Sequence, residues 1–141
     1  MGSAYAEPIT GANTVNTNDS NQKIFNAVGT SLTITNSATL SKSGVKSVGI
    51  DNQNNSTLTV HSGSTITATG SNAVSATGQS GLTINNSGTI SAGNSKAINL
   101  QNAQNSIITN NSGGIIKSNS ISITLNNTSC VICNSGILSV L

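Results

Sequence analysis

The feature that most constrains this chain is a unit of about 25 residues that returns from Leu32 to the C-terminus. Each unit holds an apolar-x-apolar pair, a small polar corner, one further aliphatic residue and a second apolar pair. Starting positions Leu32, Leu58, Leu82, Ile107 and Cys130 give periods of 26, 24, 25 and 23 residues. A fixed period in this range is typical of solenoids, in which each unit buries its apolar edge against its neighbours.

The spacing within the units predicts three short strands per turn. The step from the second residue of the first pair to the next aliphatic residue is six (34 to 40, 60 to 66, 84 to 90, 109 to 115, 132 to 138). The following step is eight in the four complete units (40 to 48, 66 to 74, 90 to 98, 115 to 123). Length varies only between the last pair and the next unit, so we expect the variable loops to leave the stack there.

These patterns predict an all-β fold, a right-handed parallel β-helix of about 4–5 coils with 23–26 residues each. Alternating apolar residues rich in Ile, Leu and Val indicate strands, and no segment has the 3.6-residue period of the helix that a leucine-rich repeat requires. Aromatic residues make up only 1% of the chain, which is unusual for an ordinary globular core. The expected inner column contains Leu58, Leu82 and Ile107. The asparagines of the polar corners are expected to form a stacked amide ladder, and they are Asn36, Asn86, Asn111 and Asn134.

Two regions follow from the pattern, a polar leader over 1–30 and β-helix coils over 31–141. Ile24 lies eight residues before Leu32, as Ile50 does before Leu58, so we expect it to close a partial capping coil. The small-x-small string Ala4-Tyr5-Ala6 resembles a signal-peptidase site and, with the composition, predicts export. The fifth unit is cut short, which predicts that the segment continues in a longer rod.

The strings LTINNSGTISAGN, LTITNSATLS and LTVHSGSTITATG resemble the β-helical passenger domains of Gram-negative autotransporters over residues 31–141. The resemblance implies an N-terminal passenger segment that is secreted or displayed on the bacterial surface and is not itself inserted in the membrane. It also implies a virulence-related adhesin or host-cell receptor ligand whose partner is a host cell-surface protein or glycan. The alternative is a structural rod that associates end to end through its unpaired strand edges.

Little in the chain is suited to catalysis, and we expect no enzyme activity, cofactor or metal. His61, the single histidine, is expected to point to solvent, and the acids are only Glu7, Asp19 and Asp51. A net charge of +2 with scattered lysines and almost no aromatic residues argues against nucleic-acid binding. Cys130 and Cys133 leave three alternatives open: a disulfide in a bent strand, free thiols, or a metal or redox site.

The variable loops on one edge are the candidate binding surface. Its candidate residues are Asp51, Asn52, Gln53, Asn54, Gln79, Gln101, Asn102, Gln104, Asn126 and Asn127. A second, apolar candidate is an outward column of Ile108 and Val131, which interrupts an aligned row of Thr33, Thr59 and Thr83 and so argues against an ice-binding threonine grid.

Overall fold

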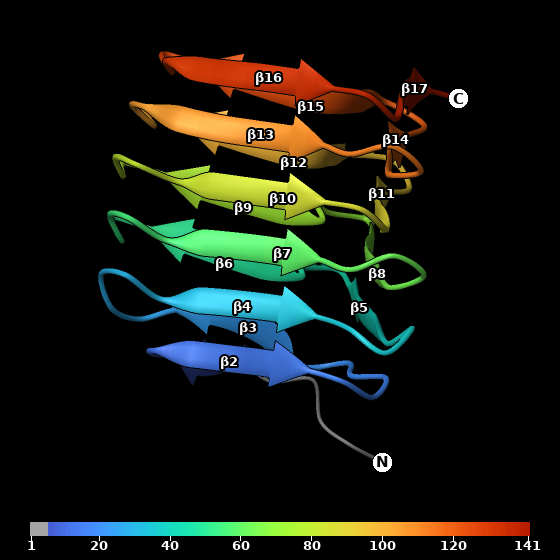
Figure 1. Cartoon of the computed structure of the whole chain (residues 1–141), viewed down its shortest axis with the longest axis horizontal. Helices are drawn as coiled ribbons and strands as arrows, with labels where there is room; N and C mark the ends of the chain where they lie inside the picture. The colour runs from blue at the N-terminus through green and yellow to red at the C-terminus, as the bar shows by residue number, and fades with distance from the viewer. Residues whose placement is uncertain (1–5) are drawn as a thin grey trace.

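The protein is a β-solenoid of about five turns, with three parallel strands in each coil (Figure 1). The computed structural model describes residues 6–141, and all of its regular elements there are strands. The coils rise from β2 near the N-terminus to β16 near the C-terminus, and strands 24–26 residues apart lie side by side. Among the described residues no helix is long and apolar enough to span a membrane.

Three sheets form the faces of the solenoid. Sheet A contains β1 (Ala6–Ile9), β3 (Gln22–Phe25), β6 (Val48–Asp51), β9 (Val74–Thr77), β12 (Lys96–Gln101) and β15 (Ile121–Asn126). Sheet B contains β2 (Ala12–Val15), β4 (Ser31–Ile34), β7 (Thr57–Val60), β10 (Thr83–Asn86), β13 (Ser106–Asn110) and β16 (Cys130–Asn134). Sheet C contains β5 (Thr39–Ser43), β8 (Thr65–Thr69), β11 (Thr89–Ala92), β14 (Ile115–Ser118) and β17 (Ile137–Val140).

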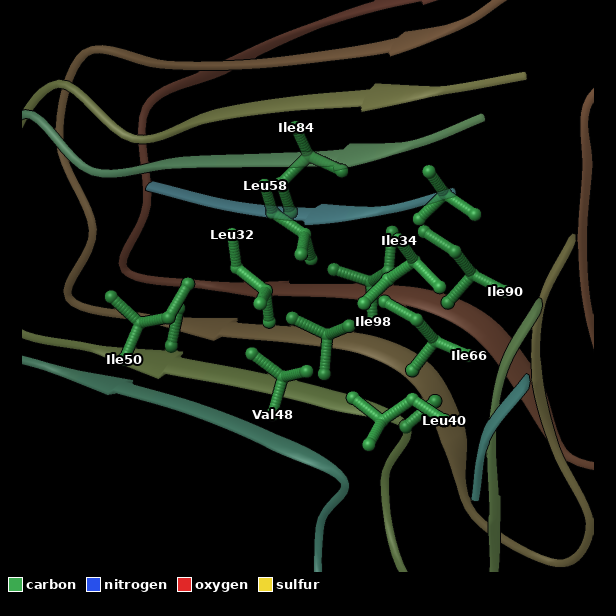
Figure 2. Packing of buried hydrophobic residues seen from close by; sticks show 14 of the residues in the cluster. Leu32, Ile34, Leu40, Val48, Ile50, Leu58, Ile66, Ile84, Ile90 and Ile98 are labelled. Atoms are coloured by element: carbon green, nitrogen blue, oxygen red, sulfur yellow. The ribbon is translucent and has the colours of Figure 1, made fainter. Parts of the chain in front are cut away.

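Aliphatic side chains at matching positions stack into one continuous core. In sheet B the central inner column is Leu32, Leu58, Ile84, Ile108 and Ile132. Its first three members follow one another up the stack in Figure 2. Because the strands alternate buried and partly exposed residues, each coil contributes a thin aliphatic layer that only its neighbours cover.

The predicted inner column of Leu58, Leu82 and Ile107 is wrong in its register. Leu58 pairs with Ile84, and Thr83 pairs with Ile107, whose side chain is 44% exposed on the outer face. Ile108 is the buried residue of that strand, at 0% exposure. In sheet C likewise, Ile116 and not Ile115 stacks on Ile90.

The error arose because the corner between sheets B and C is not constant in length. The steps between inward residues are six for Ile34 to Leu40, Val60 to Ile66 and Asn110 to Ile116, and four for Asn86 to Ile90 and Asn134 to Leu138. A pattern read from apolar residues alone misses the inward asparagines and shifts the register around them. One residue of shift exchanges the inner and outer faces of a strand.

Three inward asparagines, Asn86, Asn110 and Asn134, form an amide ladder. The prediction is confirmed for Asn86 and Asn134 and wrong for Asn111, whose place Asn110 takes, and for Asn36, which donates to the carbonyl of Asn16. The Nδ2 of Asn86 donates to the Oδ1 of Asn110 at 2.8 Å, and the Nδ2 of Asn110 donates to the Oδ1 of Asn134 at 2.8 Å. Asn110 also donates to the carbonyls of Gly114 and Ile137, at 3.2 and 3.0 Å. The buried Nδ2 groups are tolerated here because backbone carbonyls and the neighbouring amides replace their hydrogen bonds to water. The Oδ1 of Asn86, at the N-terminal end of the ladder, is buried and has no partner among residues 6–141.

The tight corners of the ladder require glycine for space. A Cβ on Gly88 would lie 2.2 Å from the carbonyl oxygen of Ser64 and 2.4 Å from that of His61. Gly136 has the same problem, 2.2 Å from the Gly114 carbonyl oxygen. At 86–88 and 134–136 the Asn-Ser-Gly string therefore forms one packing unit, in which Asn points inward and Gly lets the neighbouring coil approach. The same string at 111–113 does not, because Asn110 is the inward residue there and a Cβ on Gly113 would meet nothing within 4 Å.

The N-terminal residues form an ordered first coil with a charged cap. β1 and β3 pair in sheet A, and Phe25 stacks on Ile50, so Phe25 and not the predicted Ile24 occupies the inner position. Lys23 is 4% exposed and forms ion pairs with Glu7 and with Asp19, the latter at 2.7 Å. Ala4 and Tyr5 of the proposed processing site lie outside the described residues.

The ion pairs of the cap shift both of the groups that carry them. Burial lowers the pKa of Lys23, but its hydrogen bonds to Asp19 and Glu7 outweigh burial and the pKa is raised. Burial raises the pKa of Asp19, but the hydrogen bonds from Lys23 and from the backbone of Asn21 outweigh it and the pKa is lowered. Both shifts favour the charged pair in the folded state.

Candidate binding edge

The candidate surface is the edge where each coil passes from sheet A to sheet B, here named the A–B edge. It consists of the loops 52–56, 78–82, 102–105 and 127–129 with the last residues of β6, β9, β12 and β15. The loop backbones share left-handed positions, occupied by Asn52, Gly78, Asn102 and Asn127 in one column and by Asn55, Gly81 and Asn105 in the next. Both columns contain only Asn and Gly, because these residues adopt a positive φ at low cost.

Hydrogen bonds between successive loops make this edge a rigid part of the stack. Asn127 donates through Nδ2 to the Oδ1 of Asn102 at 2.7 Å, and Gln104 donates through Nε2 to the carbonyl of Asn127 at 3.0 Å. The Oδ1 of Asn54 accepts from the backbone N–H of Ser80 at 2.8 Å. Four predicted binding residues, Asn54, Asn102, Gln104 and Asn127, therefore use their side chains to join one coil to the next.

A second set of edge residues offers exposed polar groups to solvent. Asp51, Thr77, Gln101 and Asn126 are direct register partners, so they form one column at the end of sheet A. Asp51, Gln101 and Asn126 are exposed. Successive members of the four-residue column lie roughly 4.8 Å apart along the stack. The side chains of Asn52, Gln101 and Asn126 form no hydrogen bond within residues 6–141. The Asp51 carboxylate contacts the Lys46 ammonium at 3.6 Å.

One predicted binding residue lies inside the solenoid. Gln79 is 2% exposed, and neither its Nε2 nor its Oε1 has a hydrogen-bond partner within the described part of the chain. Its neighbour in the next coil, Ala103, is also buried, while Gln53 in the preceding coil is only half-buried. Gln79 and Ala103 turn inward, so Gln79 is removed from the candidate surface.

The cysteines and the histidine form no reactive cluster. Cys130 and Cys133 are free thiols; Cys130 belongs to the inward positions of β16, whereas Cys133 is exposed. Burial raises the pKa of the Cys130 thiol, which disfavours the reactive thiolate. His61 is exposed, as predicted, and its Nδ1 lies 2.9 Å from the Oγ1 of Thr35. No group of three or more potential metal ligands occurs among residues 6–141.

A small apolar patch lies beside the A–B edge. The outward pair is Ile107 and Val131, 44% and 59% exposed, and not the predicted Ile108 and Val131. With Asn105, Ser106, Ser129 and Cys130 they line a shallow depression. The corrected register also places Ser31, Thr57 and Thr83 in one outer row and Thr33, Thr59, Asn85 and Thr109 in the next, so an asparagine interrupts the second row.

Comparisons with protein-family models, with curated proteins and with solved structures give no match to this chain.

Proposed function

We propose that this chain is a secreted or surface-displayed β-helical passenger segment, of the type found in autotransporters, that binds a host cell-surface protein or glycan. The observation that carries the proposal is the A–B edge, where exposed amides and one carboxylate are held in a single column by a rigid stack. Such a column can hydrogen-bond an extended ligand at several points with little loss of side-chain freedom. The Ile107–Val131 patch beside it adds apolar contact area.

The residues that carry binding in this proposal are the exposed members of the column, Asp51, Gln101 and Asn126. The amides of Gln101 and Asn126 are free, and the Asp51 carboxylate lies 3.6 Å from the Lys46 ammonium. The amides that join successive loops hold these binding residues in place. Replacing whole loops by Gly-Ser would therefore destroy the stack together with the surface. Point substitutions at the exposed column residues test the surface and leave the stack intact.

The experiment compares the binding of the labelled chain to intact host cells with that of two triple variants. The edge variant carries Asp51→Ala, Gln101→Ala and Asn126→Ala. The control carries Ser41→Ala, Thr69→Ala and Asn119→Ala at exposed sites around sheet C. We expect at least tenfold weaker binding for the edge variant and unchanged binding for the control. Equal binding by all three proteins would exclude this surface as the binding site. No binding by the unaltered chain would exclude the proposed function.

A structural rod without a specific ligand is the second candidate, and the regular stack of three parallel sheets, with side-chain hydrogen bonds between successive loops, favours it. Growth of a rod by addition of copies end to end requires both ends to accept strands. Sizing over a range of concentrations tests this candidate, since a rod gives species that keep growing.

A further inference from the structure

The side-chain amide of Gln79 is the one polar group of the A–B edge that the stack buries without satisfying. Gln79 is 2% exposed, and neither its Nε2 nor its Oε1 has a hydrogen-bond partner within residues 6–141. The same loop position is occupied by the buried Ala103 in the next coil and by the half-buried Gln53 in the preceding coil. An unpaired buried amide is unfavourable, whereas the same amide at the surface is hydrated. The inward position is therefore a poor one for this side chain.

Glycine occupies both ends of the loop that carries Gln79. Gly78 and Gly81 have φ values of 74° and 77°. The loops of equal length in the two adjacent coils have asparagine at both of these positions: Asn52 and Asn55 in one, Asn102 and Asn105 in the other. Glycine reaches backbone conformations that are closed to asparagine, because it has no Cβ. Among these three loops, 78–81 is therefore the one whose backbone rotates most easily.

Few contacts hold the centre of this loop in its inward form. The carbonyl of Gln79 accepts from the backbone N–H of Gln104 at 2.9 Å, and the N–H of Ser80 donates to the Oδ1 of Asn54 at 2.8 Å. A rotation between the two glycines gives up these two bonds and gains the hydration of the amide and of the released backbone groups. The net free energies of such exchanges are similar in size, so an inward and an outward form lie close in energy.

An outward form places the Gln79 amide at the level where the exposed column has no amide or carboxylate. Of the column residues Asp51, Thr77, Gln101 and Asn126, Thr77 is the one without such a group, and its side chain is half-buried. Gln79 follows Thr77 by two residues, which is at most about 7 Å along the chain. An outward Gln79 therefore lies beside the column between Asp51 and Gln101.

We propose that loop 78–81 has a second, outward form in which Gln79 becomes a further ligand-binding residue of the A–B edge. A ligand that hydrogen-bonds along the column contacts this amide only in the outward form, so binding shifts the population toward that form. The role of Gln79 as a ligand contact rests on the proposed function of the A–B edge. The existence of the two forms does not, and it is tested without a ligand.

Nuclear magnetic resonance relaxation dispersion tests for the two forms in the free, 15N-labelled chain. We expect microsecond-to-millisecond exchange at the backbone amides of Gln79 and Ser80, with an outward form populated at roughly 1–10%. The equivalent amides of Ala103 and Gln104 should show less exchange. A loop 78–81 without exchange would overturn the proposal, since the amide would then remain inside.

Asparagine at both ends of the loop provides the matched control. The double variant Gly78→Asn with Gly81→Asn gives the loop the end residues of its two neighbours, and the asparagine side chains one coil below turn away to admit the new Cβ atoms. Stacked asparagines already occur on this edge, where Asn127 donates to the Oδ1 of Asn102 at 2.7 Å. The exchange should disappear in this variant, with an unchanged circular dichroism spectrum. Exchange that persists in the folded variant would refute the two glycines as its origin.

Gln79→Ala separates a binding role from a purely structural one. Ala103 shows that alanine fits the inward position, and the substitution removes an unpaired buried amide, so Tm should stay the same or rise. Binding to intact host cells should nevertheless weaken about fivefold, and by a similar factor in the double asparagine variant. A lower Tm for Gln79→Ala together with unchanged binding would overturn the proposal in favour of a structural role.

The outcomes distinguish this inference from the proposed function. If the unaltered chain binds cells and Gln79→Ala binds equally well, the A–B edge keeps its proposed function and the contact through Gln79 is refuted. If the unaltered chain does not bind, the proposed function and the ligand contact are refuted together. The relaxation measurement then decides the two forms of the loop by itself.

Discussion

The amide ladder gives the most direct test of the register. Asn110→Ala removes a side chain that is 1% exposed and that takes part in four hydrogen bonds, with Asn86, Asn134, Gly114 and Ile137. Asn86 keeps two carbonyl acceptors for its Nδ2, so it loses the least. The loss falls on the Oδ1 of Asn134, on the carbonyls of Gly114 and Ile137 and on the packing of the coil that contains β13.

The expected loss in the free energy of unfolding follows from the number of hydrogen bonds that the substitution removes. Two Nδ2 hydrogens and one Oδ1 atom make the equivalent of three net bonds, at about 1 kcal/mol each, and the small cavity adds to this. We expect Asn110→Ala to lower the free energy of unfolding by about 3–4 kcal/mol. Asn111→Ala is the matched control. Its Nδ2 makes one bond, to the Oγ of Ser87 at 3.0 Å, and its loss should cost about 0.5–1 kcal/mol.

Thermal and urea unfolding followed by circular dichroism measures both variants. For a chain of this size, about 3 kcal/mol corresponds to a decrease in Tm of roughly 10 °C. Amide hydrogen exchange should locate the loss in the coils from Asn86 onward, since each coil contacts only its neighbours. The reasoning is refuted if Asn111→Ala destabilises the chain as much as Asn110→Ala, because that result would place Asn111 inside.

Three further predictions concern packing, register and pH. Gly88→Ala should lower the free energy of unfolding by several kcal/mol, because its Cβ would overlap two carbonyl oxygens. Gly93→Ala, whose Cβ would have nothing within 4 Å, should leave it unchanged. Equal effects of the two substitutions would contradict the corner geometry. Ile108→Lys should prevent cooperative folding and Ile107→Lys should be tolerated, as measured by circular dichroism; the opposite result would restore the register predicted from the sequence. The lowered pKa of Asp19 stabilises the first coil above about pH 4, and this contribution is lost as the pH falls through the folded-state pKa. Hydrogen exchange of the first coil should therefore rise in acid, and Asp19→Asn should remove part of this pH dependence.

The candidate binding edge was only partly predictable. The register confirms that the predicted loops follow one another along the stack, but the predicted variation in their length is wrong. The step across this edge is six residues from Asp51 to Thr57, from Thr77 to Thr83 and from Gln101 to Ile107, and five from Asn126 to Val131, so most of the length variation lies at the corner between sheets B and C. The sequence did not distinguish the free amides of Gln101 and Asn126 from the amides of Asn102 and Asn127, which bond between loops. All four are exposed asparagine or glutamine residues, and only the positions of neighbouring loops separate their roles.

The sequence by itself determined the solenoid, its three strands per coil and its aliphatic core. Ile, Leu and Val at recurring positions can be buried together only if successive units stack, and this holds whichever residue begins the unit. Only the tertiary structure decided the register of the coils from β10 onward. Asn86, Asn110 and Asn134 are polar, and an inward position is open to them because amides and carbonyls about 24 residues away form most of their side-chain hydrogen bonds. A pattern of local hydrophobicity contains no information about such distant partners.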